Sequence, residues 1–90
     1  MNLLARRRPH RPDPGPGVVV RRARPGDDLQ IAPLVRRAGE VVPARPLAVA
    51  ERDGRIVAVQ SIPDGVLVTP HGTEPSRTLR ALGRFADAAG

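Results

Sequence analysis

The 90-residue chain contains no cysteine. Without thiols it can form no disulfide, no thiolate zinc site and no cysteine nucleophile. Tryptophan and tyrosine are also absent, and Phe85 is the only aromatic residue. Stacking of aromatic side chains on nucleic-acid bases is therefore excluded as a main binding mechanism.

Long apolar runs are missing as well. No segment approaches the roughly 18 apolar residues that a membrane-spanning helix needs. The first residues, MNLLARRRPHRP, lack the apolar stretch of a secretory signal. We therefore expect a cytoplasmic protein with no membrane partner, and a single small domain with a limited core.

Lysine is a further absence, because all fifteen basic residues are arginines. The net charge of +6 resides in residues 1–24, where seven arginines accompany Asp13, while eight arginines balance eight acids in residues 25–90. Together with the many alanines, prolines and glycines, this usage is typical of a genome of high GC content. Residues 25–90 are therefore expected to be electrically neutral overall.

Residues 1–17 are rich in arginine, proline and glycine and have no hydrophobic periodicity. We predict that they form a disordered arm and that the domain spans residues 18–90. The arm has two interpretations: codon bias that fills a disordered tail with arginine, or a segment that binds the phosphate backbone of nucleic acid. The candidate nucleic-acid contacts are Arg6, Arg7, Arg8 and Arg11.

The domain is predicted to begin with a strand, VVVRRA, and a helix. Asp27 is expected to cap this helix, and its buried face follows the spacing i, i+3, i+4, i+7. Pro33 predicts a kink or a late start, and Gly39 ends the helix. The residues of the buried face are Ile31, Leu34, Val35 and Ala38.

The segment LAVAERDGRIVAV, residues 47–59, predicts a hairpin around a two-residue turn at Asp53 and Gly54. Both of its faces are apolar, so each is expected to be covered. One face is predicted to show Leu47, Val49, Ile56 and Ala58, and the other Ala48, Ala50, Val57 and Val59. The predicted pairs are Arg52 with Arg55, Glu51 with Ile56, Val49 with Ala58 and Leu47 with Gln60.

A third strand is predicted from Val66 to Thr69, and a closing helix from Glu74 and Pro75 to Gly90. The fold class is thus α+β, an antiparallel sheet of about four strands with two helices, in the order β-α-β-β-β-α. The apolar stripe of the closing helix is Leu79, Leu82, Phe85, Ala86 and Ala89.

This order resembles the first half of the GNAT acyltransferase fold. The family commonly opens with a strand reading like Ile-Arg-x-Ala, followed by a Pro and an Asp that starts the first helix, and VRRARPGDD at 20–28 is similar. LAVAERDGRIVAV resembles its second and third strands, which join through an Asp-Gly turn. The resemblance covers residues 18–90 and implies a short, stand-alone form of actinobacterial type.

In this family, the next strand often ends in Val-x-Pro and leads to a Gln/Arg-x-x-Gly-x-Gly/Ala loop that binds the pyrophosphate of acetyl-CoA through backbone N–H groups. VTP at 68–70 matches the strand end and places this phosphate loop at TEPSRT, residues 73–78. Pro75 removes one N–H from the loop, and Glu74 adds a negative charge. The candidate cofactor-binding residues of this degenerate loop are Thr73, Ser76, Arg77 and Thr78.

The resemblance leads us to expect a small GNAT-like domain without acetyltransferase activity, cofactor or metal, which acts as a binding or interaction module. Two alternatives stay open. One is an N-acyltransferase that binds acetyl-CoA or CoA at the modified loop and completes its groove by dimerising. The other is nucleic-acid binding through the arm. We assign no catalytic residue: Glu51 is interpreted as a solvated residue near the turn and His71 as a turn residue.

A sheet of this kind leaves an open edge. Unpaired backbone groups on an edge strand are a template for pairing with another chain. We therefore expect a homo-oligomer or a protein partner at that edge.

Overall fold

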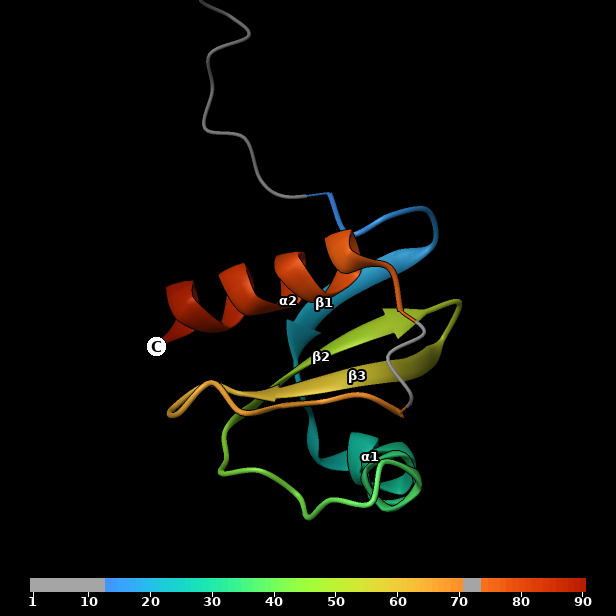
Figure 1. Cartoon of the computed structure of the whole chain (residues 1–90), viewed down its shortest axis with the longest axis vertical. Coiled ribbons are helices and arrows are strands. Elements are labelled where there is room, and N and C mark those ends of the chain that lie inside the picture. The colour runs from blue at the N-terminus through green and yellow to red at the C-terminus, as the bar shows by residue number, and fades with distance from the viewer. Residues whose placement is uncertain (1–12, 71–73) are drawn as a thin grey trace, which may run out of the picture.

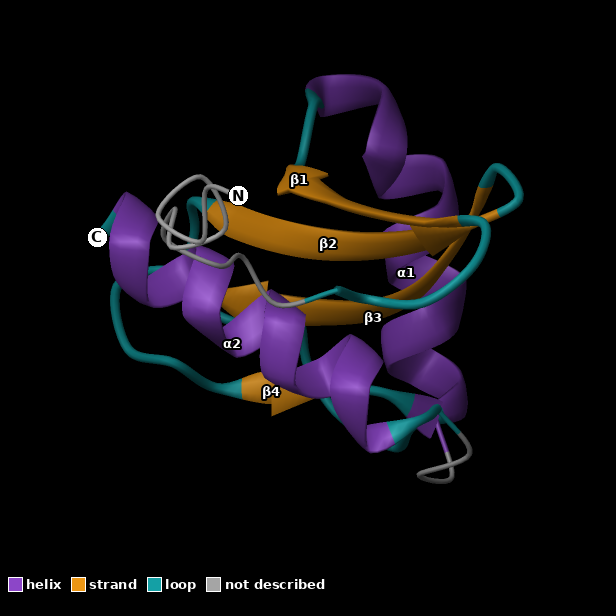
Figure 2. Ribbon diagram, turned by 90° about the horizontal axis from the view of Figure 1, so that it is seen from above, coloured by secondary structure: helices purple, strands orange, loops and turns teal. Residues whose placement is uncertain are grey.

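The computed structural model describes residues 13–70 and 74–90, which form a four-stranded antiparallel sheet in the order β1-β2-β3-β4 (Figure 1). Helix α1 packs on one face of the sheet and helix α2 on the other (Figure 2). Along the chain the order is strand, helix, three strands, helix. The predicted α+β class and element order are confirmed.

Strand β1 (Val18–Arg22) and helix α1 (Asp28–Arg37) are joined by a 3-10 turn, Pro25–Asp27. Pro33 lies inside α1, and the helix runs through it without interruption. The helix ends before Gly39, whose φ of +72° lies in the left-handed region that favours glycine.

Strands β2 (Leu47–Arg52) and β3 (Arg55–Ser61) form the predicted hairpin. Asp53 and Gly54 make its turn, and both have positive φ, as a two-residue turn between twisted strands requires. Arg52 pairs with Arg55, as the turn predicts.

A β-bulge interrupts the hairpin next to its turn. Glu51 pairs with Ile56, but Ala50 pairs with Ala58, so Val57 has no partner in β2. Val57 and Ala58 both contact the layer under α2. A bulge places two residues of one strand opposite one of its neighbour, and every later residue of β3 is displaced by one position.

The bulge corrects two predicted pairs and two predicted faces. Ala58 lies on the α2 face and Val59 on the α1 face, the reverse of the expectation. Both faces of the hairpin are apolar, so the pattern of apolar residues does not indicate the one-residue shift of β3. The observed pairs are Val49 with Val59 and Leu47 with Ser61.

Strand β4 (Leu67–Val68) is shorter than the predicted strand from Val66 to Thr69. It pairs only with the far end of β3, and Pro70 follows soon after it. Helix α2 (Ser76–Ala89) occupies the predicted range. No helix of the described residues is long and apolar enough to cross a membrane.

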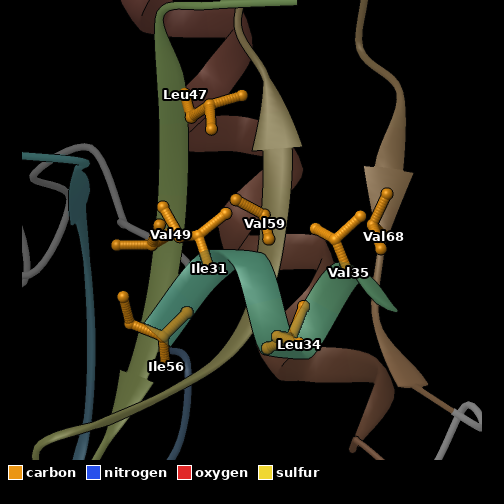
Figure 3. Packing of buried hydrophobic residues seen from close by; sticks show 8 residues of the cluster. All are labelled: Ile31, Leu34, Val35, Leu47, Val49, Ile56, Val59 and Val68. Atoms are coloured by element: carbon orange, nitrogen blue, oxygen red, sulfur yellow. The ribbon is translucent and has the colours of Figure 1, made fainter. Parts of the chain in front are cut away.

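The layer between α1 and the sheet contains the large branched side chains of the core (Figure 3). Leu34 is 1 % exposed and Val59 is fully buried, so the layer is closed to solvent. Its eight buried members are Ile31, Leu34, Val35, Leu47, Val49, Ile56, Val59 and Val68.

The layer between α2 and the sheet is built from small side chains. Leu82 is its only buried member larger than alanine, and it is fully buried. Small residues let the helix approach the sheet closely, and partly buried residues close the margins. The buried members are Ala48, Ala50, Ala58, Leu82 and Ala86.

Candidate functional site

The N-terminal turn of α2 holds three of the four predicted cofactor-binding residues. Ser76 and Arg77 are exposed there, whereas Thr78 is fully buried. Thr73 lies outside the described residues, as do His71 and the arginines at 6, 7, 8 and 11. The structure therefore brings Ser76, Arg77 and Thr78 together on one helical turn but gives them different surroundings.

The buried hydroxyl of Thr78 is occupied by the protein itself. It donates a hydrogen bond to the carbonyl oxygen of Pro14 at 2.7 Å. Residues 13–17 cross the start of α2 at this point, and Gly15 lies against Arg77 so closely that a Cβ on Gly15 would be 3.1 Å from the guanidinium Nε. The N-terminal segment 13–17, placed by sequence in the arm, thus packs on the candidate phosphate loop.

Acidic Glu74 is also engaged within the chain. Its carboxylate forms an ion pair with Arg52, whose other terminal nitrogen donates to the Thr78 hydroxyl at 3.5 Å. Pro75, the residue before the helix, has no N–H, and its carbonyl oxygen accepts from the N–H groups of Thr78 and Leu79 at 3.0 and 3.3 Å. A pyrophosphate at this turn would meet a carboxylate and a proline where the family has backbone donors.

A second polar cluster, which we call the Arg21 cluster, joins Arg21, Asp27 and Glu51. Arg21 donates hydrogen bonds to the Asp27 carboxylate through both terminal nitrogens, at 2.7 and 3.1 Å. It also donates to the Glu51 carboxylate through Nε and Nη2, at 3.1 and 2.8 Å. Its fifth N–H donates to the carbonyl oxygen of Arg22 at 3.0 Å. Every donor of the guanidinium is satisfied, and the cluster ties β1 to β2 and to the turn before α1.

The Arg21 cluster corrects two expectations. Asp27 makes no capping hydrogen bond to α1 with its side chain; its carboxylate accepts instead from Arg21 and from the backbone N–H of Arg24, at 2.7 Å. Glu51 is not merely solvated, because its side chain is only 26 % exposed and pairs with Arg21. Both carboxylates are paired with the same guanidinium, so each is engaged within the protein.

Asp27 makes folding stability depend on pH. Hydrogen bonding to Arg21 lowers the pKa of Asp27 from 3.8 to about 2. The folded state holds this proton less tightly than the unfolded chain, so its contribution is present above about pH 4 and is lost as the pH falls toward 2.

We expect wild type to lose about 2 kcal/mol of unfolding free energy from this group between pH 4 and 2. Urea unfolding across that range, on wild type and Asp27→Asn, measures the difference. The variant should be less stable at neutral pH and should lose less stability on acidification. Parallel pH profiles for the two proteins would show that Asp27 is not the responsible group.

A shallow groove of about 360 Å³ runs between α1 and the tip of the hairpin. Gln30 joins α1 to the hairpin there: Oε1 accepts from the N–H of Ile56 at 2.8 Å, and Nε2 donates to the carbonyl oxygen of Gly54 at 3.4 Å. The groove contains neither a carboxylate nor a nucleophile and offers no catalytic chemistry. Its lining residues are Leu29, Gln30, Pro33, Arg37, Arg55 and Ile56.

The sheet ends in two edge strands of different character. β4 has two residues and is followed by Pro70, and short strands and prolines both protect an edge. β1 has five residues and contains neither proline nor bulge. No described strand lies beyond β1. We call the side of β1 that faces away from β2 the β1 edge. It presents a longer row of backbone donors and acceptors than the outer side of β4 does.

Comparison of the chain with protein-family models, with curated proteins and with solved structures gave no match. Within residues 13–70 and 74–90, no group of three or more His, Asp or Glu side chains is arranged to hold a metal ion.

Proposed function

We propose that the chain is a small GNAT-like interaction domain that has no acetyltransferase activity and pairs with another chain through the β1 edge. The observation that carries this proposal is the closed start of α2. Four features occupy the position of the family's phosphate loop: the Glu74 ion pair, Pro75, the Thr78 hydrogen bond and the N-terminal segment 13–17.

The β1 edge supplies the positive part of the proposal. Strand addition gains affinity from backbone hydrogen bonds, which an unprotected edge strand offers without any further rearrangement. Helices α1 and α2 cover the two faces of the sheet. The β1 edge is therefore the part of the sheet that can contact a partner. The domain would therefore act by assembly rather than by chemistry.

The first test is thermal unfolding of the full chain with acetyl-CoA, with free CoA and with ADP. A ligand that binds only the folded state stabilises it by RT ln(1 + [L]/Kd), so even a weak site is detected at millimolar ligand. We expect no change in melting temperature with any of the three.

A rise with acetyl-CoA and CoA that ADP does not reproduce would contradict the proposal. The variant Ser76→Asp then locates the site, because a carboxylate at the first turn of α2 would repel a bound pyrophosphate. Loss of the rise in this variant would assign binding to the phosphate loop.

A further inference from the structure

The backbone groups of β1 divide between its two sides. In an antiparallel pair, hydrogen-bonded residues alternate along the strand. The carbonyl oxygen of Gly17 accepts from Asp53 at 3.1 Å, and the N–H of Ala23 donates to Leu47 at 2.9 Å, so the odd-numbered residues bond to β2. The residues whose N–H and C=O groups point away from β2 are Val18, Val20 and Arg22.

Two of these six groups already have partners within the chain. The N–H of Val18 donates to the carbonyl oxygen of Gly15 at 3.2 Å, and the carbonyl oxygen of Arg22 accepts from the Arg21 side chain at 3.0 Å. Four have no partner among residues 13–70 and 74–90 and face outward for another chain: the carbonyl of Val18, both groups of Val20 and the N–H of Arg22.

These four groups are complementary to themselves under a two-fold axis. We propose, resting on the proposed function, that the partner is a second copy of this chain, with the two β1 strands antiparallel about an axis at Val20. Val20 then exchanges two hydrogen bonds with Val20 of the second copy. The N–H of each Arg22 donates to the carbonyl of Val18 in the other copy, so all four groups on each strand are used.

Neighbouring registers use the edge less well. Placing Val18 opposite Val20 requires the Val18 N–H, which is engaged by Gly15. Placing Arg22 opposite Val20 requires the Arg22 carbonyl, which is engaged by Arg21. The latter register also brings the two Arg22 residues within about 7 Å of each other along the strands. The two-fold register at Val20 avoids both conflicts.

Charge and apolar area agree with this register. The two Arg22 residues lie four positions apart, about 13 Å along the strands, which exceeds the screening length of about 8 Å at physiological salt. Arg21 is paired with Asp27 and Glu51, so the Arg21 cluster carries no net positive charge. The side chain of Val19 is 52 % exposed in the single chain. In the dimer it lies diagonally opposite Val19 of the second copy, on the α1 side of the sheet, and the two side chains gain apolar contact.

Sedimentation of the full chain over a concentration series tests the assembly. One five-residue strand from each copy is a small interface, so we expect a monomer–dimer equilibrium that shifts toward dimer as concentration rises. Val20→Pro removes an outward N–H without touching a bond to β2, and we expect it to sediment as a monomer. The matched control is Leu67→Pro, which places a proline on the opposite edge and should dimerise like wild type.

Cysteine variants test the register, because the chain has no cysteine of its own. Directly opposed residues of a hydrogen-bonded pair have Cα atoms about 5.5 Å apart, within reach of a disulfide. Val20→Cys should therefore form a covalent dimer under mild oxidation, and Arg22→Cys should not. Equal cross-linking of the two variants would overturn the register.

The outcomes separate this inference from the proposed function. A chain that stays monomeric into the millimolar range overturns the dimer, while the acetyl-CoA test is unaffected. If Val20→Pro melts cooperatively and still dimerises, the proposed pairing of the two β1 strands is also overturned. Binding of acetyl-CoA would overturn the proposed function and leave the sedimentation result standing.

Discussion

Replacing Leu82 by alanine should come close to unfolding the domain. The buried members of the α2 layer are four alanines and this single leucine, so the substitution removes the one large side chain at its centre and leaves a cavity. A buried leucine-to-alanine change costs about 3 kcal/mol, and a domain of this size has about 5 kcal/mol in total. We expect the melting temperature to fall by about 15 °C.

Thermal and urea unfolding of Leu82→Ala measure this loss. The control is Leu79→Ala, one turn earlier on α2, where the side chain is only partly buried and the expected cost is about 1 kcal/mol. Equal losses in the two variants would mean that α2 is not held by Leu82, and that the small side chains beneath it carry the packing.

The second large effect is expected from Arg21→Met. This change removes the cation from two carboxylates whose side chains are only 12 % and 26 % exposed, and leaves Asp27 and Glu51 near each other without a counter-charge. Removing one partner from such a cluster is more damaging than removing all of its charges. We expect a loss of about 2 to 3 kcal/mol at neutral pH, measured by urea unfolding.

The triple variant Arg21→Met, Asp27→Asn, Glu51→Gln separates charge from packing. Without carboxylates to leave uncompensated, it should recover at least half of the stability lost by the single variant. A triple variant as unstable as the single one would show that the hydrogen-bond geometry of the Arg21 cluster, rather than its charge balance, holds β1 in place.

Most of the fold is predictable from local signals. The turn at Asp53 and Gly54 fixes the hairpin, and helical spacing from Ile31 to Ala38 fixes α1 and its buried face. Pro33 is misleading about the start of α1, which lies at Asp28. Proline removes one backbone hydrogen bond, and the packing of Ile31 and Leu34 against the sheet outweighs that loss.

The candidate site is less predictable, because its contacts join residues far apart in the sequence. The sequence alone shows that Glu74 adds a negative charge to the loop and that Pro75 removes an N–H group from it. No local signal predicts the hydrogen bond from Thr78 to Pro14, because the two residues are sixty-four positions apart. Arg21 and Glu51 are related by strand register, and register follows only once the sheet is assembled.

The bulge at Val57 also bears on how this sequence can evolve. Val57 is the extra residue of β3, so a chain that lacks it would still place Ala58 opposite Ala50 on the α2 face and Val59 opposite Val49 on the α1 face. Such a deletion removes the bulge and the contact of Val57 with the α2 layer, and it leaves the other members of both layers in place. Chain length at this position should therefore vary more freely than elsewhere in the hairpin, and related chains should include some that lack one residue here.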